Sequence, residues 1–429
     1  GLYRLRTTDH RLQKEEAVDG RQSTVVYFLP SCEISSIYSQ GGKGRRIHTL
    51  FMFPKLESVD KFNKELIKRR ANLRSDGRPI VGIPSRDLAK IALDCDEKAL
   101  VIPAHAWTPW FSIFGSFSGF DSIEECFGDM APYIYGIETG LSSDPAMNWQ
   151  ISDLENRSIL SFSDAHSLEK MGREATVFEG NEVSYDCIYN AIKGYHGEKE
   201  YHEYHGNDED KKARGTRDTL TTRDTSKLSF TIEFYPEEGK YHFTGHRNCS
   251  YSQGPEVDRN RPCPVCGRGL TVGVMDRVGE LKNRQSLSTN QNEKFPDGNP
   301  KIKIEEIDGV KWSKSSDNRP PYVSLVPLGE ILAEALSVGA GTQRVRDVYM
   351  ALVTNLGSEF GVLMRASAGD IARVAGGRVA EAVAKVRHGD IVVEPGYDGQ
   401  FGVVKIWPGA KEDKVENAKS PEDQLNLFV

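Results

Sequence analysis

Residues 1 to about 185 alternate between short apolar runs and longer stretches in which apolar residues recur every three or four positions. The apolar runs, which are typical of buried strands, lie at 25–30, 99–103 and 159–162. Helical spacing occurs between them at 59–71, 85–93 and 122–127. Because strands that alternate with helices form parallel sheets, the pattern predicts an α/β fold with a parallel sheet or barrel.

The pattern changes in the second half of the chain. Helical spacing returns at 328–336, 343–356 and 370–386, and a hairpin is predicted around Gly396 to Gly399. We expect the chain to divide into a barrel at 1–193, a charged flexible insert at 194–227, a Cys/His segment at 228–283, a linker at 284–319, an α+β domain at 320–408 and a charged tail at 409–429.

Composition narrows the class of protein. The chain has 429 residues, of which 38% are hydrophobic and 27% charged, as in globular proteins. No apolar run reaches 18 residues, so we expect no membrane span. Only three of the seven cysteines are clustered, which argues against a disulfide framework and for a cytoplasmic location. A net charge of −7 argues against a general nucleic-acid coat but leaves room for a local basic groove.

Five potential metal ligands follow predicted strands: Glu33, His48, His105, Asp164 and His166. The carboxyl ends of parallel strands meet at one mouth of a barrel, so we expect these side chains to converge. Imidazole and carboxylate ligands suit Zn, Mn or Fe, and two or three such ions can hydrolyse a phosphoester. A structural, hydrogen-bonded role is the alternative for any one of the histidines, but all five together favour a metal site.

The segments around these residues resemble endonuclease Q, a DNA-repair group of the PHP (polymerase and histidinol phosphatase) family. The similar motifs are PSCEIS, GRRIHTL, PAHAWTPWFS, GIETGLSSDPAMNW, SFSDAHSLEKMGREA and IEFYPEEGKYHFTGHRNC. The resemblance implies a distorted (β/α)7 barrel that holds Zn, Mn or Mg, with the five residues above as ligands. It also implies an endonuclease that nicks DNA 5′ to deaminated bases (uracil, hypoxanthine, xanthine) or abasic sites, associated with the nucleoid.

The resemblance has one gap. The family opens with an HxH motif and a further Asp and His, and none of these precedes the segment at Gly1. We therefore expect an N-terminally truncated copy that lacks about four ligands. Two alternatives stay open beside the nuclease: a PHP-type phosphatase acting on a small phosphate ester, and a non-catalytic fragment that binds DNA or the sliding clamp.

A second group of metal ligands is predicted near the middle of the chain. His246 and Cys249 are followed by Cys263 and Cys266 in a CPVCG knuckle, a spacing typical of structural zinc. His242 is the alternative for His246 as the fourth ligand. A reduced CxxC without metal is the competing interpretation.

A basic stretch surrounds His48. Between Lys43 and Arg78 there are eleven Lys or Arg and four acidic residues, a local charge of +7. Contact with DNA phosphates is one interpretation, and a solvated helix face is the other. We expect Lys43, Arg45 and Arg46 to bind DNA, because they are predicted to lie in a Gly-rich loop beside His48.

Three further features bear on recognition. An enzyme that acts on one damaged base must extrude and stack it, so Trp107 and Trp110 are candidates for a base pocket, with core packing as the alternative. Glu138 is a candidate for base contact or for support of a ligand. The C-terminal QLNLF, with Gln424, Leu425, Leu427 and Phe428, resembles the bacterial sliding-clamp-binding peptide.

Overall fold

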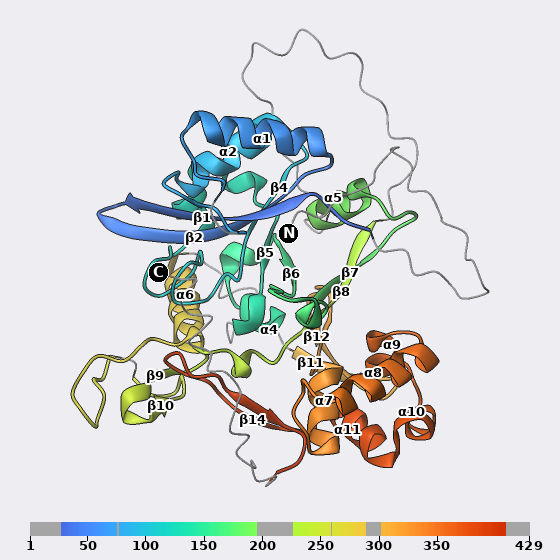
Figure 1. Cartoon of the computed structure of the whole chain (residues 1–429). Helices are drawn as coiled ribbons and strands as arrows, with labels where there is room; N and C mark the ends of the chain where they lie inside the picture. The colour runs from blue at the N-terminus through green and yellow to red at the C-terminus, as the bar shows by residue number, and fades with distance from the viewer. Residues whose placement is uncertain (1–26, 75–76, 195–225, 259, 289–301, 409–429) are drawn as a thin grey trace.

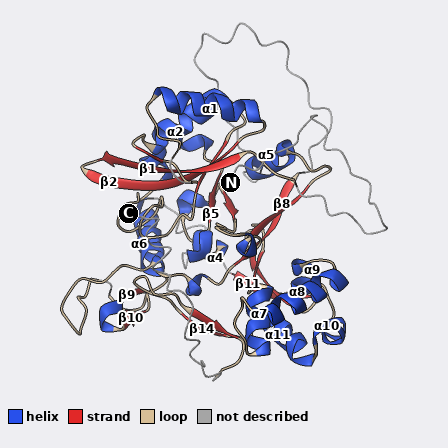
Figure 2. Cartoon of the chain, viewed as in Figure 1, coloured by secondary structure: helices blue, strands red, loops and turns tan. Residues whose placement is uncertain are grey.

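The structure, a computed structural model, describes residues 27–74, 77–194, 226–258, 260–288 and 302–408. Figure 1 shows a long blue hairpin with helices above it, a central region of short strands below it, and a separate group of orange and red helices at the opposite end. Figure 2 shows how the strands are distributed among these regions.

The N-terminal sheet is mixed and has the strand order β3-β1-β2-β4. Its strands are β1 (Ser31–Gln40), β2 (Lys43–Met52), β3 (Ile80–Val81) and β4 (Leu100–Pro103). β2 runs antiparallel to both β1 and β4, and β3 runs parallel to β1. Gly41 and Gly42, with φ of 62° and 74°, form the two-residue turn, a conformation that suits glycine.

Successive side chains of β2 point to opposite faces of the sheet, one toward the helices and the other away from them. Ile47 and Phe51 are fully buried in the core beneath α1 (Leu56–Lys68) and α2 (Ser85–Cys95). The ring of Phe62 on α1 lies 5.2 Å from that of Phe51, centroid to centroid. Successive side chains of a strand leave opposite faces, so His48 points away from these helices.

Two further sheets occupy the centre of the molecule. β5 (Gly136–Glu138) and β6 (Ser158–Leu160) pair in parallel. The helices of this region are α3 (Ile123–Phe127), α4 (Pro145–Asn148) and α5 (Tyr185–Gly194). A five-stranded sheet has the order β11-β12-β13-β8-β7. Its strands are β7 (Ala175–Glu179), β8 (Lys227–Glu233), β11 (Ile302–Ile307), β12 (Val310–Ser315) and β13 (Tyr322–Ser324).

After β8, the Cys/His segment continues with a pair of short strands and a helix that contacts this centre. β9 (Thr244–His246) and β10 (Tyr251–Gln253) form a small antiparallel pair, and α6 (Val274–Ser288) follows. The buried Arg277 of α6 donates hydrogen bonds to the carbonyls of Phe114 and Phe120, each at 3.0 Å. The helix thereby fixes the loop that follows β4.

The C-terminal region packs five helices on a second hydrophobic core. They are α7 (Leu328–Leu336), α8 (Gln343–Leu356), α9 (Glu359–Met364), α10 (Ala368–Ala375) and α11 (Gly377–His388). The helices predicted at 328–336 and 343–356 are confirmed. The single helix predicted at 370–386 is wrong, because Gly376 adopts φ of 90° and separates α10 from α11.

The predicted hairpin after α11 is confirmed. β14 (Val392–Glu394) pairs antiparallel with β15 (Val403–Lys405). Short 3-10 helices complete the described ranges: η1 (Gly128–Tyr133), η2 (Gly140–Ser142), η3 (Ser152–Leu154), η4 (Leu168–Lys170), η6 (Pro236–Glu238) and η7 (Arg247–Cys249). Within these ranges, no helix combines the length and apolarity needed to cross a bilayer.

The predicted parallel barrel differs from the observed sheets. The described strands form five separate sheets, and none of these closes into a barrel. The strand predicted at 99–103 exists as β4, but it pairs antiparallel with β2. Residues 27–30 of the first apolar run precede β1 and are not part of a strand. The apolar composition of β4 indicates only that both of its faces are buried. An antiparallel strand inside the molecule meets this condition as well as a parallel one.

Candidate metal centre

The β1–β2 hairpin supplies the first two side chains of the site. Ser35 is the direct partner of His48, and Glu33 lies two residues before Ser35, so Glu33 and His48 leave the same face. Glu33 Oε1 lies 2.9 Å from His48 Nδ1. The prediction that each follows a parallel strand is wrong for these two residues, because both lie inside the strands of an antiparallel hairpin.

His105 enters the site from the end of β4. It has φ of 30°, a conformation that is strained for a residue with a side chain. Its backbone N–H donates to Oε2 of Glu138 at 2.8 Å. A Cβ at Gly140 would lie 2.5 Å from the Cβ of His105, so only glycine allows this approach. The buried Glu138 thus acts on the site through the backbone of His105.

Glu33, His48 and His105 converge on one point. His48 Nδ1 lies 3.0 Å from His105 Nε2, and His105 Nε2 lies 3.4 Å from Glu33 Oε1. Ligand atoms bound at about 2.0–2.1 Å to a single ion lie about 2.9–3.4 Å apart, whether the geometry is octahedral or tetrahedral. The three atoms therefore have the spacing of ligands on a shared cation, although they come from two strands and the loop that follows a third.

Thr108 selects the tautomer of His105. Its hydroxyl donates to the carbonyl of Trp110 at 2.8 Å and lies 3.2 Å from His105 Nδ1. Because the single hydroxyl proton is used on Trp110, the hydroxyl oxygen accepts from Nδ1–H of His105. The lone pair of a neutral His105 is then on Nε2, which faces Glu33 and His48, as a metal ligand requires.

The electrostatics of the cluster favour a bound cation. Glu33 Oε1 is buried and accepts no hydrogen bond among the described residues. Burial opposes ionisation of Glu33, but the imidazoles of His105 and His48 hold the pKa of its carboxyl well below the usual range. Burial lowers the pKa of His48 to about 4. Burial also opposes protonation of His105, yet the Glu33 carboxylate raises the pKa of His105 to about 9.

Asp164 and His166 lie on the other side of an arginine. Asp164 has φ of 43°, and Arg173 Nη2 donates to its carbonyl at 3.2 Å. His166 Nδ1 lies 3.8 Å from Asp164 Oδ1, and its side chain is 64% exposed. The structure therefore places these two residues next to each other but outside the compact group formed by Glu33, His48 and His105.

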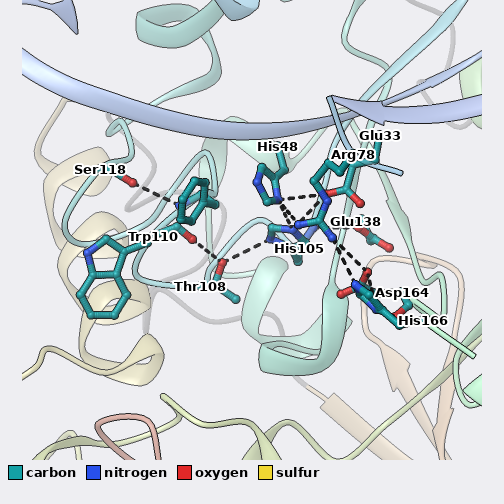
Figure 3. Close-up of polar contacts among 11 residues, drawn as sticks. Glu33, His48, Arg78, His105, Thr108, Trp110, Ser118, Glu138, Asp164 and His166 are labelled. Carbon is teal, nitrogen blue, oxygen red and sulfur yellow. Dashed lines mark hydrogen bonds and ion pairs between the residues drawn. The ribbon is translucent and has the colours of Figure 1, made fainter. Parts of the chain in front are cut away.

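Arg78 fills the space between the two groups. Its Nε lies 3.2 Å from Glu33 Oε1 and its Nη1 lies 3.0 Å from His48 Nδ1. Its Nη2 lies 3.5 Å from His166 Nε2 and 4.0 Å from Asp164 Oδ1. Figure 3 shows the guanidinium between the labelled side chains. In the sequence, Arg78 stands out only as part of a basic stretch, since nothing in its local pattern indicates that it reaches the candidate ligands.

A buried polar network lies between β8 and the residues that directly follow β5 and β6. The fully buried Glu233 lies at hydrogen-bond distance from Thr139 Oγ1 at 2.9 Å and Ser161 Oγ at 3.1 Å, and from Thr231 Oγ1. Burial raises the pKa of the Glu233 carboxyl, and it raises that of the neighbouring Glu174 as well. Thr139 follows Glu138 directly, so this network supports the strand that carries the hydrogen-bond acceptor of His105.

The Cys/His segment forms a second compact group. One ligand atom from each of His246, Cys249, Cys263 and Cys266 lies within 4.8 Å of the others. Cys266 Sγ lies 3.3 Å from His246 Nδ1. His242, the alternative fourth ligand, is buried and lies outside this group. Two thiols from one knuckle, a third thiol and an imidazole form a donor set that suits zinc.

The basic residues beside His48 have two different environments. Lys43, Arg45 and Arg46 lie on β2, so the predicted Gly-rich loop is limited to the hairpin turn. Arg45 is buried, donates to the carbonyl of Gly119 and pairs with Glu125 at 3.0 Å, so its predicted role in DNA contact is wrong. Lys43 and Arg46 are exposed.

The two candidate tryptophans also differ. Trp107 is 1% exposed and its Nε1 donates to Asn148 Oδ1 at 2.7 Å, so it belongs to the core and cannot stack a base. Trp110 stacks on Phe117 with ring centroids 4.6 Å apart and planes 3° apart. Tyr241 meets the edge of Trp110 at 5.5 Å. Phe117 is 51% exposed, which leaves this aromatic stack open to a ligand.

Some predictions lie outside the described residues. These are the segment before residue 27, most of the insert at 194–227, part of the linker at 284–319 and the QLNLF peptide with Gln424, Leu425, Leu427 and Phe428.

Comparisons with known proteins support a nuclease-like fold. The lesion-specific endonuclease PfuEndoQ from Pyrococcus furiosus is 28% identical, with a TM-score of 0.65 over 91% of this chain and 81% of that chain. A second solved structure is a complex of endonuclease Q with a 27-mer duplex substrate that carries an abasic lesion at the active site. It is 28% identical, with a TM-score of 0.64 over 91% of this chain and 82% of that chain. The predicted resemblance to endonuclease Q is confirmed, and the fold is a mixed α/β fold similar to that enzyme.

The sequence relatives are uncharacterised. Residues 327–390 match the family described as MJ0043 C-terminal domain. The uncharacterized protein MJ0043 of Methanocaldococcus jannaschii is 27% identical over 313 residues, which are 71% of this chain and 32% of that protein. The chain thus spans about a third of that relative. The uncharacterized protein YqxK of Bacillus subtilis is 26% identical over 370 residues, 86% of this chain and 76% of YqxK.

Proposed function

We propose that this protein is a metal-dependent DNA endonuclease that nicks 5′ to deaminated bases (uracil, hypoxanthine, xanthine) or abasic sites. The observation that carries the proposal is the convergence of Glu33, His48 and His105 within 3.4 Å of one another. It occurs in a chain whose solved structural neighbours are lesion-specific endonucleases.

The side chains fit a cation that acts in hydrolysis. Glu33, His48 and His105 would hold one ion, and Asp164 and His166 would hold another beyond Arg78, with Zn, Mn or Mg as candidates. Ions bound there would supply an activated water and neutralise charge on the phosphoryl oxygens as the 3′-hydroxyl leaves. Glu138 would keep His105 in its strained conformation, and Thr108 would keep its Nε2 available as a ligand.

The surrounding surface supports a nucleic-acid substrate. The exposed Lys43 and Arg46 lie on the strand that carries His48, where they would contact DNA phosphates. The stack of Trp110 on Phe117 is held through Thr108 next to His105, and an extruded base could stack there. A PHP-type organisation with the domain boundaries predicted above is part of this proposal.

The Cys/His group has a separate role in the proposal. We assign His246, Cys249, Cys263 and Cys266 to a structural zinc ion, because four protein ligands leave no open position for a substrate. α6 follows this group and holds the loop that contains Trp110. Contact of the QLNLF peptide with the sliding clamp remains a proposal that co-purification with the clamp would test.

An incision assay on the full chain tests the function. Duplexes that carry one deoxyuridine, deoxyinosine or abasic site are incubated with Mn²⁺ or Mg²⁺, and the product ends are mapped. We expect a nick 5′ to the lesion that needs the metal and disappears with EDTA. His48→Ala is expected to reduce the rate more than about 100-fold, because even residues that only support a metal ligand contribute up to that much. His388→Ala, on α11, is the matched control.

The alternatives give different results in the same assay. Turnover of a small phosphate ester such as histidinol phosphate, without nicking of any lesion duplex, would favour the phosphatase. Binding of duplex without either reaction would favour a non-catalytic protein. An unchanged rate in His48→Ala would remove the candidate centre from the mechanism.

A further inference from the structure

Arg78 is the one cation that the described residues place inside the candidate metal centre. Its side chain is 21% exposed, and its guanidinium lies 3.2 Å from Glu33 Oε1 and 3.0 Å from His48 Nδ1. Both of these atoms belong to the residues whose spacing matches ligands on a shared ion. On its other side the guanidinium lies 3.5 Å from His166 Nε2.

A metal ion and this arginine cannot use the same lone pairs. His48 Nδ1 lies at hydrogen-bond distance from Arg78 Nη1 here, and its lone pair would have to bind the ion in a loaded site. A guanidinium is always protonated, so it cannot lose its charge when a divalent cation arrives. Two cations a few ångströms apart in a partly buried site repel strongly, and the arginine must move when the metal binds.

The contacts of Arg78 are consistent with release. Arg78 Nε lies 3.2 Å from Glu33 Oε1, but this oxygen accepts no hydrogen bond among the described residues, so the contact lacks the two-pronged pairing that makes arginine–carboxylate contacts strong. The distance to Asp164 Oδ1 is 4.0 Å, at the limit of an ion pair. The partial exposure of the side chain leaves it a path toward solvent, where a DNA strand would lie.

We propose that Arg78 is a tethered cation that occupies the ligand cluster in the metal-free protein and binds a phosphodiester of the DNA once metal replaces it. This inference rests on the proposed function. Arginine is suited to both positions, because its planar donors match carboxylate and phosphate oxygens alike. Metal and DNA then support each other: the ion frees Arg78 for the phosphate, and the phosphate withdraws Arg78 from the ligands.

The test compares Arg78→Met with the wild type in the full chain. Mn²⁺ affinity is measured without DNA from the electron paramagnetic resonance signal of the free ion. Duplex affinity is measured at saturating Mn²⁺ by fluorescence anisotropy on a deoxyuridine duplex. For Arg78→Met we expect Mn²⁺ to bind about tenfold tighter or more, within the usual range of coupling between sites, and the duplex to bind more weakly than to the wild type.

Two more variants separate this role from a structural one. Arg74→Met removes the same charge from an exposed position four residues away, and it is expected to leave the Mn²⁺ affinity unchanged. Arg78→Lys keeps the positive charge and is expected to keep the Mn²⁺ affinity near that of the wild type. If Arg78→Met misfolds, a loss of Mn²⁺ affinity in Arg78→Lys would still overturn the proposal.

The outcomes are distinct. Tighter Mn²⁺ together with weaker duplex binding in Arg78→Met supports the proposal. An unchanged or weaker Mn²⁺ affinity overturns it, and so does a tighter Mn²⁺ site with unchanged duplex affinity. If this pattern appears but the wild type nicks no lesion duplex, the nuclease assignment fails while the competition between arginine and metal stands.

Discussion

Replacing Glu233 by glutamine is expected to stabilise the protein at neutral and alkaline pH. Glu233 is fully buried, and both hydroxyls at its Oε2 have a second acceptor: Thr139 Oγ1 lies 3.1 Å from the carbonyl of Leu160, and Ser161 Oγ lies 3.0 Å from that of Ile232. A neutral acid suits this network, because its proton goes to one hydroxyl, which then donates to its carbonyl, while the other hydroxyl donates to Oε2. The amide of Gln satisfies it too, with two N–H donors in place of Oε2.

The sign of the pH dependence follows from the raised pKa of Glu233. A carboxyl with a higher pKa in the folded protein takes up a proton on folding, since a free glutamate has a pKa of about 4.3. The contribution of Glu233 to the free energy of unfolding is complete below the pKa of a free glutamate. It is lost as the pH rises from there toward the pKa of Glu233 in the folded protein. Because folding takes up one proton, the free energy of unfolding falls by about 1.4 kcal/mol per pH unit between these two pKa values. Glu233→Gln removes this slope.

Urea unfolding at pH 5, 6 and 7 measures the effect. The free energy of unfolding of Glu233→Gln relative to the wild type should increase by about 1.4 kcal/mol for each pH unit. The exposed Glu57→Gln is the control, and its curve should run parallel to that of the wild type. Parallel curves for Glu233→Gln and the wild type would refute the inference that Glu233 is protonated in the folded protein.

Three further changes test the site. Cys266→Ser should remove one zinc per chain by elemental analysis and lower the thermal midpoint; wild-type protein without zinc would contradict the structural site. Glu138→Ala should weaken Mn²⁺ binding about tenfold or more, whereas Glu138→Gln should keep it, because an amide oxygen still accepts from the backbone N–H of His105. Trp110→Ala should weaken binding of an abasic duplex by about 1–3 kcal/mol in anisotropy titrations, with Trp110→Phe close to the wild type; equal losses in both would argue against stacking.

Most of the secondary structure of the second half can be predicted from the sequence, because local signals define it there. The helices at 328–336 and 343–356 have regular apolar spacing, and the Asp398-Gly399 pair marks the last hairpin. The first half was predicted less well. A run of apolar residues indicates burial but not strand direction, so the antiparallel pairing of β2 with β1 and β4 could not be derived from it.

The candidate site shows the same limit. Their residue types and their places near predicted strands led to the prediction that Glu33, His48 and His105 share a metal site. Two of them, Glu33 and His48, lie inside strands and not after them. Arg78 was missed because a basic residue in a loop carries no local sign of its long-range contacts. Arg45 and Trp107 were assigned to ligand contact because their residue types suit DNA, whereas their burial depends on Gly119, Glu125 and Asn148, which lie far away in sequence.

The β1–β2 hairpin also constrains how this protein can diverge. Glu33 and His48 leave the same face of the hairpin only because the turn at Gly41 and Gly42 keeps β1 and β2 in their present register. Inserting or deleting one residue on either strand between Glu33 and His48 would turn one of them toward the helices and exchange it for an apolar neighbour. Length changes in this hairpin should therefore survive in natural variants only in steps of two residues, or beyond the stretch that joins these two side chains.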